Sequence, residues 1–232
     1  MTAPEHEQET NRLEALFSYG LLDTPPDGTF DRVTRLAARH FKAPIASVSL
    51  VDHDRIWFLS KAGMDAVETT RDPGLCASVI LSDEAYVVRD ALHDPRTLEN
   101  PLVRGELGLR FYAAVPLTTH DGYRLGTMNV IDFEPRDFDA ADEDALRDFA
   151  GIVMEQMELR LASRKIVASL TAVFRASKDP ENLVTVCAWT KKINVGGQWM
   201  SFDDFLVKTL GFSTTHSIHP DAMNEVLDKD KP

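Results

Sequence analysis

Residues 110–132 read RFYAAVPLTTHDGYRLGTMNVID, and this stretch decides the fold. Two runs of β-branched, aromatic and other apolar residues flank a polar turn, Thr118 to Arg124, which contains Asp121-Gly122. An Asp-Gly pair supplies the positive backbone angles that a tight connection needs, and the flanking residues fit a pleated, half-buried surface. The stretch therefore predicts an antiparallel β-hairpin.

Two helices and another hairpin are predicted upstream of this stretch. Residues 5–19 carry a narrow apolar stripe at helical spacing, which stops at Gly20 before a Pro-Pro pair. A second helix is expected from about Asp27, with apolar residues on one face up to Phe41. Residues 45–52 and 55–63 then read as two strands joined by a His-Asp turn.

The middle of the chain predicts shorter elements. Asp72-Pro73 is typical of entry into a short helix, and a short strand is expected at residues 86–89. Residues 90–108 are rich in Asp, Asn, Pro and Gly, which favours an irregular loop with brief helical turns. Loops of this length inside a compact domain are commonly functional.

A long helix is predicted after the opening hairpin. It starts near Asp139, and the sequence has no Pro or Gly between Gly151 and Ser177. Five apolar residues lie on the face expected to close the sheet: Leu146, Ala150, Val153, Met157 and Leu161. Three others fall seven apart, as expected for a helix that pairs with its own copy: Leu159, Ile166 and Val173. The alternative is that these three pack on the tail.

Composition limits the classes of partner. The 232 residues are 44% hydrophobic and 27% charged, which is ordinary for a soluble globular protein. The formal net charge is −12, and no Lys/Arg cluster is present beyond Lys191-Lys192 and Arg164-Lys165, so we expect no nucleic-acid partner. The polar, acidic first residues and the absence of an apolar run of roughly 20 residues predict a cytoplasmic protein without membrane contact.

The order of elements resembles the GAF domain, a sensor module of bacterial signal transduction. The resemblance spans roughly residues 10–165 and rests on LLDTPPDGTFDRVTRLAARHF, PIASVSLVDHDRIWFLSKAG, DPRTLENPLV with LRFYAAVPL, and LGTMNVIDFEPRDF. It implies an α+β fold: an antiparallel sheet of about five to six strands with helices on both faces. A long C-terminal helix and a small tail of a β-hairpin and a helix follow. The predicted divisions are an N-terminal helix at 1–20, the sensor domain at 21–160, a helical linker at 161–180 and a tail module at 181–232.

The resemblance also indicates a place for a ligand. In this family a small molecule binds between the sheet and the irregular connection after the middle strand. The positions that map to the walls of such a pocket are Trp57, Cys76, Asp90, Phe111 and Tyr112. Aromatic residues with one carboxylate suit a small-molecule pocket. The alternative is that the aromatic residues pack in the core. The identity of the ligand, and of any cofactor, is left open.

Cys76 raises the question of thiol chemistry. An enzymatic relative, free methionine-(R)-sulfoxide reductase, needs more than one cysteine, whereas Cys187 lies beyond the predicted linker. The usual histidine two residues after the cysteine is replaced by Ser78. We therefore predict no catalytic residues and no enzymatic activity. A thiol-dependent reductase and a structural interaction protein without a ligand remain as alternatives.

The tail resembles a short bacterial module with Cys-x-x-Cys-Lys-Lys-Ile and His-Gly-Ile-Cys-Pro-x-Cys motifs. Four cysteines in two pairs would make a tetrahedral zinc site. Here Thr190 and Ala222 stand at two of these positions, and His219 stands where the third cysteine is expected. With Cys187 and His219 left, and His216 as a third candidate, we predict no bound metal.

The resulting functional hypothesis is a sensory module. It binds a small molecule or a protein partner, forms a homodimer through its N-terminal and long helices, and signals through a separate output protein.

Overall fold

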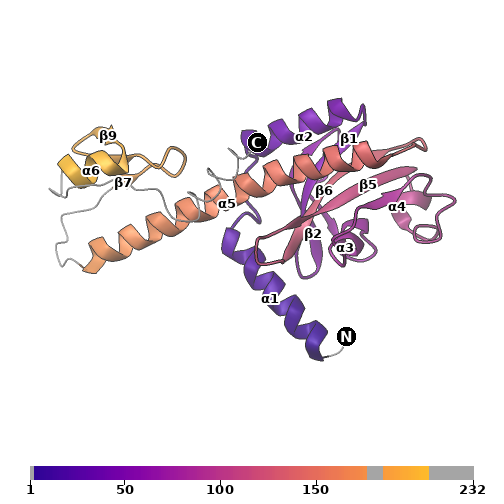
Figure 1. Cartoon of the computed structure of the whole chain (residues 1–232), viewed down its shortest axis with the longest axis horizontal. Helices are drawn as coiled ribbons and strands as arrows, with labels where there is room; N and C mark the ends of the chain where they lie inside the picture. Colours follow the sequence, from indigo (N-terminus) through magenta and orange to yellow (C-terminus); the bar gives the residue numbers. More distant parts are fainter. Residues whose placement is uncertain (1–2, 177–184, 209–232) are drawn as a thin grey trace, which may run out of the picture. The chain divides into compact units, whose positions relative to one another are not determined.

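The structure is a computed structural model, which describes residues 3–176 and 185–208 (Figure 1). Contacts divide the chain into two compact units, Met1–Ala162 and Ser163–Pro232. The long helix α5 (Ala140–Ala176) begins in the first unit and ends in the second. In the part of the chain that the structure describes, no helix is long and apolar enough to cross a membrane.

The first unit is built on a six-stranded sheet in which every neighbouring pair is antiparallel. Its strands are β1 (Ile45–Val51), β2 (Arg55–Ala62), β3 (Glu68–Thr70), β4 (Tyr86–Val88), β5 (Phe111–Thr118) and β6 (Arg124–Asp132). They lie in the order β3-β2-β1-β6-β5-β4. The hairpin of β5 and β6 thus lies beside the hairpin of β1 and β2, with β6 and β1 at the centre.

The β5–β6 hairpin has the predicted turn. Gly122 has a φ of +84°, a backbone conformation that favours glycine, and its N–H donates to the Thr119 carbonyl at 2.9 Å. A second glycine lets β6 and β1 approach closely. A Cβ added to Gly126 would lie 1.9 Å from the Ser49 carbonyl oxygen, so no other residue fits without moving the backbone.

Helices α2 (Gly28–His40) and α5 cover one face of the sheet (Figure 1). The C-terminal end of α1 (Ala3–Tyr19) adds Leu16 and Tyr19 to the same core. Asp27 caps α2, because its carboxylate accepts a hydrogen bond from the Thr29 N–H at 2.8 Å. The core on this face is mostly apolar and contains Leu16, Phe30, Val33, Leu50, Phe111, Met128, Leu146, Ala150, Val153 and Met157. Two buried hydroxyls, those of Thr34 on α2 and Ser60 on β2, lie 2.9 Å apart. We call this side the α2/α5 face.

The other face carries two short helices, α3 (Leu75–Val79) and α4 (Pro101–Arg104). A smaller apolar cluster lies between these helices and the sheet, and it contains Val51, Ile56, Leu75, Val79, Val88, Val103, Leu109 and Ala114. Asn100 caps α4 by accepting a hydrogen bond from the Leu102 N–H at 2.9 Å. We call this side of the sheet the α3 face.

The second unit contains a three-stranded antiparallel sheet in the order β7-β8-β9 and a helix. The elements are β7 (Thr185–Val186), β8 (Ile193–Val195), β9 (Gln198–Met200) and α6 (Phe202–Lys208). Ile193 and Phe205 are its most deeply buried apolar residues among those described.

The predicted α+β architecture is confirmed. The antiparallel sheet, the helices on both faces and the long helix α5 are present where the sequence predicted them. The tail has a three-stranded sheet with a helix in place of the predicted hairpin with a helix, because β7 pairs with β8. Strand β3 was not predicted, since its three residues carry only a weak strand pattern, and its pairing with β2 places it at the sheet edge. Along α5, Leu159 and Ile166 are more than half exposed, and the side chain of Val173 lies outside the described residues.

Candidate functional site

Phe111 and Tyr112, two neighbouring predicted site residues on β5, face opposite sides of the sheet. Phe111 packs in the α2/α5 face beside Phe138, with ring centroids 5.6 Å apart. Tyr112 faces the other way, into the cluster beneath α3. Because side chains alternate along a strand, the two aromatic rings lie on opposite faces of the sheet.

A set of uncharged polar side chains is buried on the α3 face. We call it the polar cluster, and its members are Ser47, Ser49, Cys76, Tyr112, Thr127 and Asn129. The serines come from β1, Thr127 and Asn129 from β6, Tyr112 from β5 and Cys76 from α3. Each is at most 7% exposed. Three strands and one helix therefore meet at a polar centre within an otherwise apolar layer.

Hydrogen bonds connect the whole polar cluster. The Cys76 thiol accepts from the Ser49 hydroxyl and from the Tyr112 hydroxyl, each at 3.3 Å. The hydroxyls of Ser49 and Thr127 lie 2.7 Å apart, and the Asn129 amide donates to Thr127 at 3.0 Å. Ser47 donates to the Asn129 side-chain oxygen at 2.8 Å. Mutual pairing satisfies these groups away from water.

The electrostatics of the polar cluster keep it neutral. Burial disfavours the charged phenolate, and the adjacent Cys76 adds to this effect, so the pKa of Tyr112 lies well above its ordinary value. Tyr112 consequently remains a hydrogen-bond donor at neutral pH. Cys76 is the single cysteine of residues 1–162.

A pocket of about 850 Å³ lies on the outer side of α3. Its lining includes Gly74, Ala77 and Ser78 at α3, together with Arg96 and Asn100 from the irregular connection. Asn100 ties the two walls together, because its side-chain amide donates to the Pro73 carbonyl at 2.7 Å. The volume is in the range of small-molecule sites. Helix α3 separates this pocket from the polar cluster.

Asp90 lies at the start of the irregular connection and holds it to β5. Its carboxylate accepts three hydrogen bonds from Arg110, at 2.9 to 3.0 Å, and lies 2.8 Å from Nδ1 of His93. Burial would raise the pKa of Asp90, but the hydrogen bonds from His93 and Arg110 outweigh it and lower the pKa below its usual value. The carboxylate therefore anchors the connection.

Trp57 lies on β2 and packs against the α2/α5 core, with the Arg55 guanidinium 5.5 Å from its ring centroid. Thus Cys76 and Tyr112 meet in the polar cluster, whereas Trp57 and Phe111 face the opposite core. Binding of a ligand by any of the five predicted residues stays a prediction.

Four members of the polar cluster were missed from the sequence: Ser47, Ser49, Thr127 and Asn129. A signal for them exists, because each pair is spaced two residues apart within an apolar strand. This alternation places both members of a pair on one buried face. Their meeting across β1 and β6 follows from the register, which sets Ser47 opposite Asn129 and Ser49 opposite Thr127.

The tail offers no metal cluster in its described portion. Among residues 3–176 and 185–208, no group of three or more His, Cys, Asp or Glu side chains can hold a metal ion. His216 and His219 lie outside the described residues. Hydrogen bonds from Thr190 lower the pKa of Cys187. The absence of a metal in the tail stays a prediction.

Comparison with known proteins places the first unit in a family. The family model described as GAF domain matches residues 25–157, which is more than half of the chain. The chain belongs to the GAF family.

Two solved structures share the GAF fold. One is the GAF domain of an Acinetobacter phosphoenolpyruvate-protein phosphotransferase: identity 18%, TM-score 0.50, covering 70% of this chain and 97% of that one. The other is the blue-light absorbing form of the Thermosynechococcus elongatus PixJ GAF domain: identity 14%, TM-score 0.51, covering 71% and 95%.

A sequence relative brings one correction. A Pseudomonas aeruginosa protein named cyclic di-GMP phosphodiesterase is 40% identical over 184 residues, which cover 78% of this GAF chain and 31% of the relative. The prediction that the protein is not an enzyme is wrong by this finding, because a relative matching most of the chain is named as one. The sequence pattern could not reveal this, since the chain spans about a third of the relative's length.

Proposed function

We propose that this GAF module senses a small molecule in a bacterial signalling protein and controls the turnover of cyclic di-GMP. The observation that carries the proposal is the arrangement around α3, which has the 850 Å³ pocket on its outer side and the polar cluster beneath it. A ligand that moves α3 would change the hydrogen bonds that Cys76 makes with Ser49 and Tyr112.

The sheet provides a route from α3 to the long helix. Thr127 and Asn129 of the polar cluster belong to β6, and the chain passes from β6 into α5 after a short connection. The exposed Leu159 and Ile166 on α5 are seven residues apart, which supports pairing of α5 with a second copy. A dimeric helix would transmit a movement of the sheet to an attached or separate output domain.

The proposed output follows from the Pseudomonas relative, whose name states a cyclic di-GMP phosphodiesterase. A chimera tests this assignment: residues 1–176 of this chain replace the matching segment of the relative. We expect hydrolysis of cyclic di-GMP that changes when α3 is altered by Ser78→Trp. Hydrolysis that is the same in both chimeras would contradict a regulatory role.

The ligand is tested by native mass spectrometry of the protein purified from its source organism. We expect a bound mass that is lost on denaturation and absent from Ser78→Trp, in which the indole fills the outer pocket. The matched control is Leu36→Trp on the exposed surface of α2. A bound mass retained by both variants, or none in the unmodified protein, would refute binding in this pocket.

Oligomeric state is tested by size-exclusion chromatography with light scattering. We expect a dimer at micromolar concentration, which Leu159→Glu and Ile166→Glu together convert to a monomer. A monomeric unmodified protein would contradict transmission through a paired α5.

A further inference from the structure

A second pocket lies beside the middle of α1. Its volume is about 600 Å³, and its lining comes from α1, from the end of α3 and from the β5–β6 hairpin. Helix α1 contributes Gln8, Glu9 and Arg12, and the loop after β3 contributes Arg71. The segment after α3 contributes Ile80 and Leu81, and the hairpin contributes Gly122, Tyr123 and Arg124. Neither the GAF family assignment nor the proposed sensor function accounts for this pocket.

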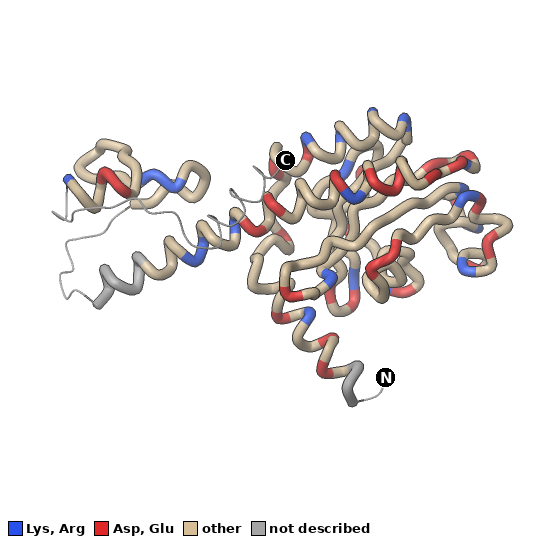
Figure 2. Tube along the Cα trace, viewed as in Figure 1, with Lys and Arg blue, Asp and Glu red and all other residues tan. Residues whose placement is uncertain are grey.

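Charge distinguishes this pocket from the surrounding surface. The chain carries a formal net charge of −12, and acidic residues are frequent along the beginning of α5 (Figure 2). In contrast, the pocket is lined by three arginines and a single carboxylate, that of Glu9. The positive charge gathered here favours an anion.

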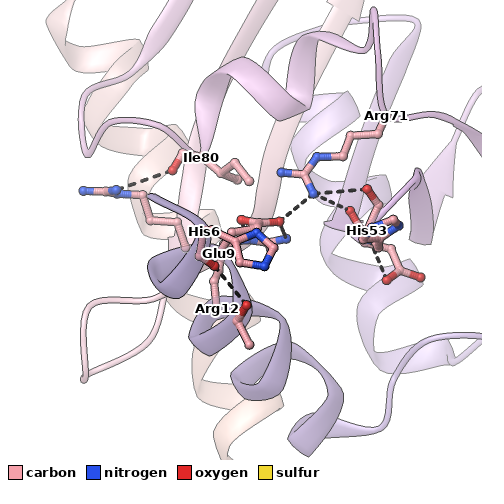
Figure 3. Close-up of polar contacts among 9 residues, drawn as sticks. His6, Glu9, Arg12, His53, Arg71 and Ile80 are labelled. Carbon is pink, nitrogen blue, oxygen red and sulfur yellow. Dashed lines mark hydrogen bonds and ion pairs between the residues drawn. The ribbon is translucent and has the colours of Figure 1, made fainter. Parts of the chain in front are cut away.

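Glu9 is shared between two of the arginines, as Figure 3 shows. Its carboxylate accepts two hydrogen bonds from Arg12, both at 2.8 Å, and one from Arg71 at 2.6 Å. Arg71 also donates to the backbone carbonyl of Asp52 at 2.9 Å, which holds its guanidinium in place. One carboxylate therefore faces two fixed cations.

Arg12 keeps one donor without a partner. Its side chain is 8% exposed, and its Nη1 atom is buried and makes no hydrogen bond to the described residues. A buried guanidinium N–H without an acceptor is costly, and native proteins rarely leave one. Arg12 lines the pocket, so a rotation of its guanidinium would bring Nη1 to an oxygen of a bound molecule, the acceptor that would satisfy it.

The third arginine extends the donor set across the pocket. Arg124 comes from β6, pairs with Asp83 at 2.6 Å and reaches the Ile80 carbonyl at 3.4 Å. Asp83 is 71% exposed, so solvent screens this pair and an anion can compete for Arg124. Guanidinium groups from three separate segments suit a phosphate, which offers more terminal oxygens than a carboxylate does.

Apart from the Gln8 amide, the remaining side chains of the lining are apolar or aromatic. Ile80 and Tyr123 contribute to the wall, and Leu81 is 76% exposed although its side chain is apolar. An organic group attached to the phosphate would cover Leu81 and remove it from water.

We propose that this pocket binds a small phosphate ester, with its phosphate held by Arg12, Arg71 and Arg124 and its apolar part against Leu81 and Tyr123. Binding would join α1 to the end of α3 and to the hairpin, so it would order the N-terminal helix against the sheet.

Isothermal titration of the full chain at fixed ionic strength tests the proposal with phenyl phosphate, inorganic phosphate and benzoate as probes. We expect saturable binding of phenyl phosphate, weaker binding of inorganic phosphate and the weakest binding of benzoate. If inorganic phosphate binds with the same affinity as phenyl phosphate, the ligand is a free phosphate ion and the proposal of a phosphate ester is wrong. If benzoate binds with the same affinity as phenyl phosphate, the site does not select phosphate over carboxylate, and the proposal is wrong.

Variants locate the site. Arg12→Gln should weaken binding of phenyl phosphate by about 10- to 100-fold, the effect of losing charge-assisted hydrogen bonds. Arg35→Gln on the exposed surface of α2 removes the same charge and should leave binding unchanged. If Arg12→Gln does not fold, Arg124→Gln decides, with an expected loss of about 3- to 10-fold. Equal affinities in the arginine variants and the Arg35→Gln control, or no saturable binding by the unmodified chain, would refute the site.

Discussion

The two faces of the GAF sheet are built by different means. The α2/α5 face is closed by apolar side chains such as Phe30, Phe111 and Leu146, each at most 1% exposed. The α3 face buries a connected set of hydroxyl, thiol, phenol and amide groups beneath a helix of five residues. Apolar contacts are non-directional, whereas hydrogen bonds require defined geometry. The first face therefore provides stability, and the second defines the position of α3.

Neighbouring residues on β5 allow the comparison to be tested at one place in the sheet. Phe111→Ala should lower the free energy of unfolding by about 3–5 kcal/mol, because it leaves a cavity among tightly packed side chains. Tyr112→Phe keeps the ring and removes only a hydroxyl, so its cost should be about 1 kcal/mol. Urea denaturation followed by circular dichroism measures both. Equal losses would contradict the assignment of stability to the α2/α5 face.

The polar cluster itself gives the next largest effect. Asn129→Ala should cost about 1–3 kcal/mol, because Ser47 loses its acceptor and remains buried. The double variant Ser47→Ala with Asn129→Ala should cost less than the sum of the single variants, since neither partner is then left unpaired. Additive losses in this double-mutant cycle would mean that the hydrogen bond does not couple the two strands.

A pH dependence of stability should arise from Glu9 on α1. Burial would raise the pKa of Glu9, but the hydrogen bonds and charges of Arg12 and Arg71 lower it from 4.5 to about 2. A folded-state pKa below the unfolded value adds stability above pH 4.5, and this stability is lost as the pH falls toward 2. Because solvent screens the partly exposed carboxylate, we expect a loss of about 1–2 kcal/mol.

Thermal unfolding between pH 2 and pH 6 measures this contribution. Glu9→Gln should lower stability at pH 6 and flatten the acid dependence, whereas Glu14→Gln, exposed on the same helix, should leave the dependence unchanged. If the stability of both variants falls equally between pH 6 and pH 2, Glu9 is not the source of the acid dependence.

Secondary structure was predictable because it depends on local patterns. The turn at Asp121-Gly122, the spacing of apolar residues along α2 and α5 and the change of period at Ile45 indicate helices and strands within a few residues of their observed bounds. The pairs Ser47 with Ser49 and Thr127 with Asn129 also carry a readable two-residue spacing. Strand β3 was too short for such a pattern, and its pairing with β2 decided its structure.

By itself, the sequence determined the GAF fold and the long helix. Tertiary structure alone decided which side chains meet: Phe111 and Trp57 face the opposite core, and Glu9, Arg12, Arg71 and Arg124 converge from distant parts of the chain. The physical reason is that periodicity fixes the direction of a side chain relative to its own strand or helix. Strand order and the packing of α1 fix which residues lie across from it.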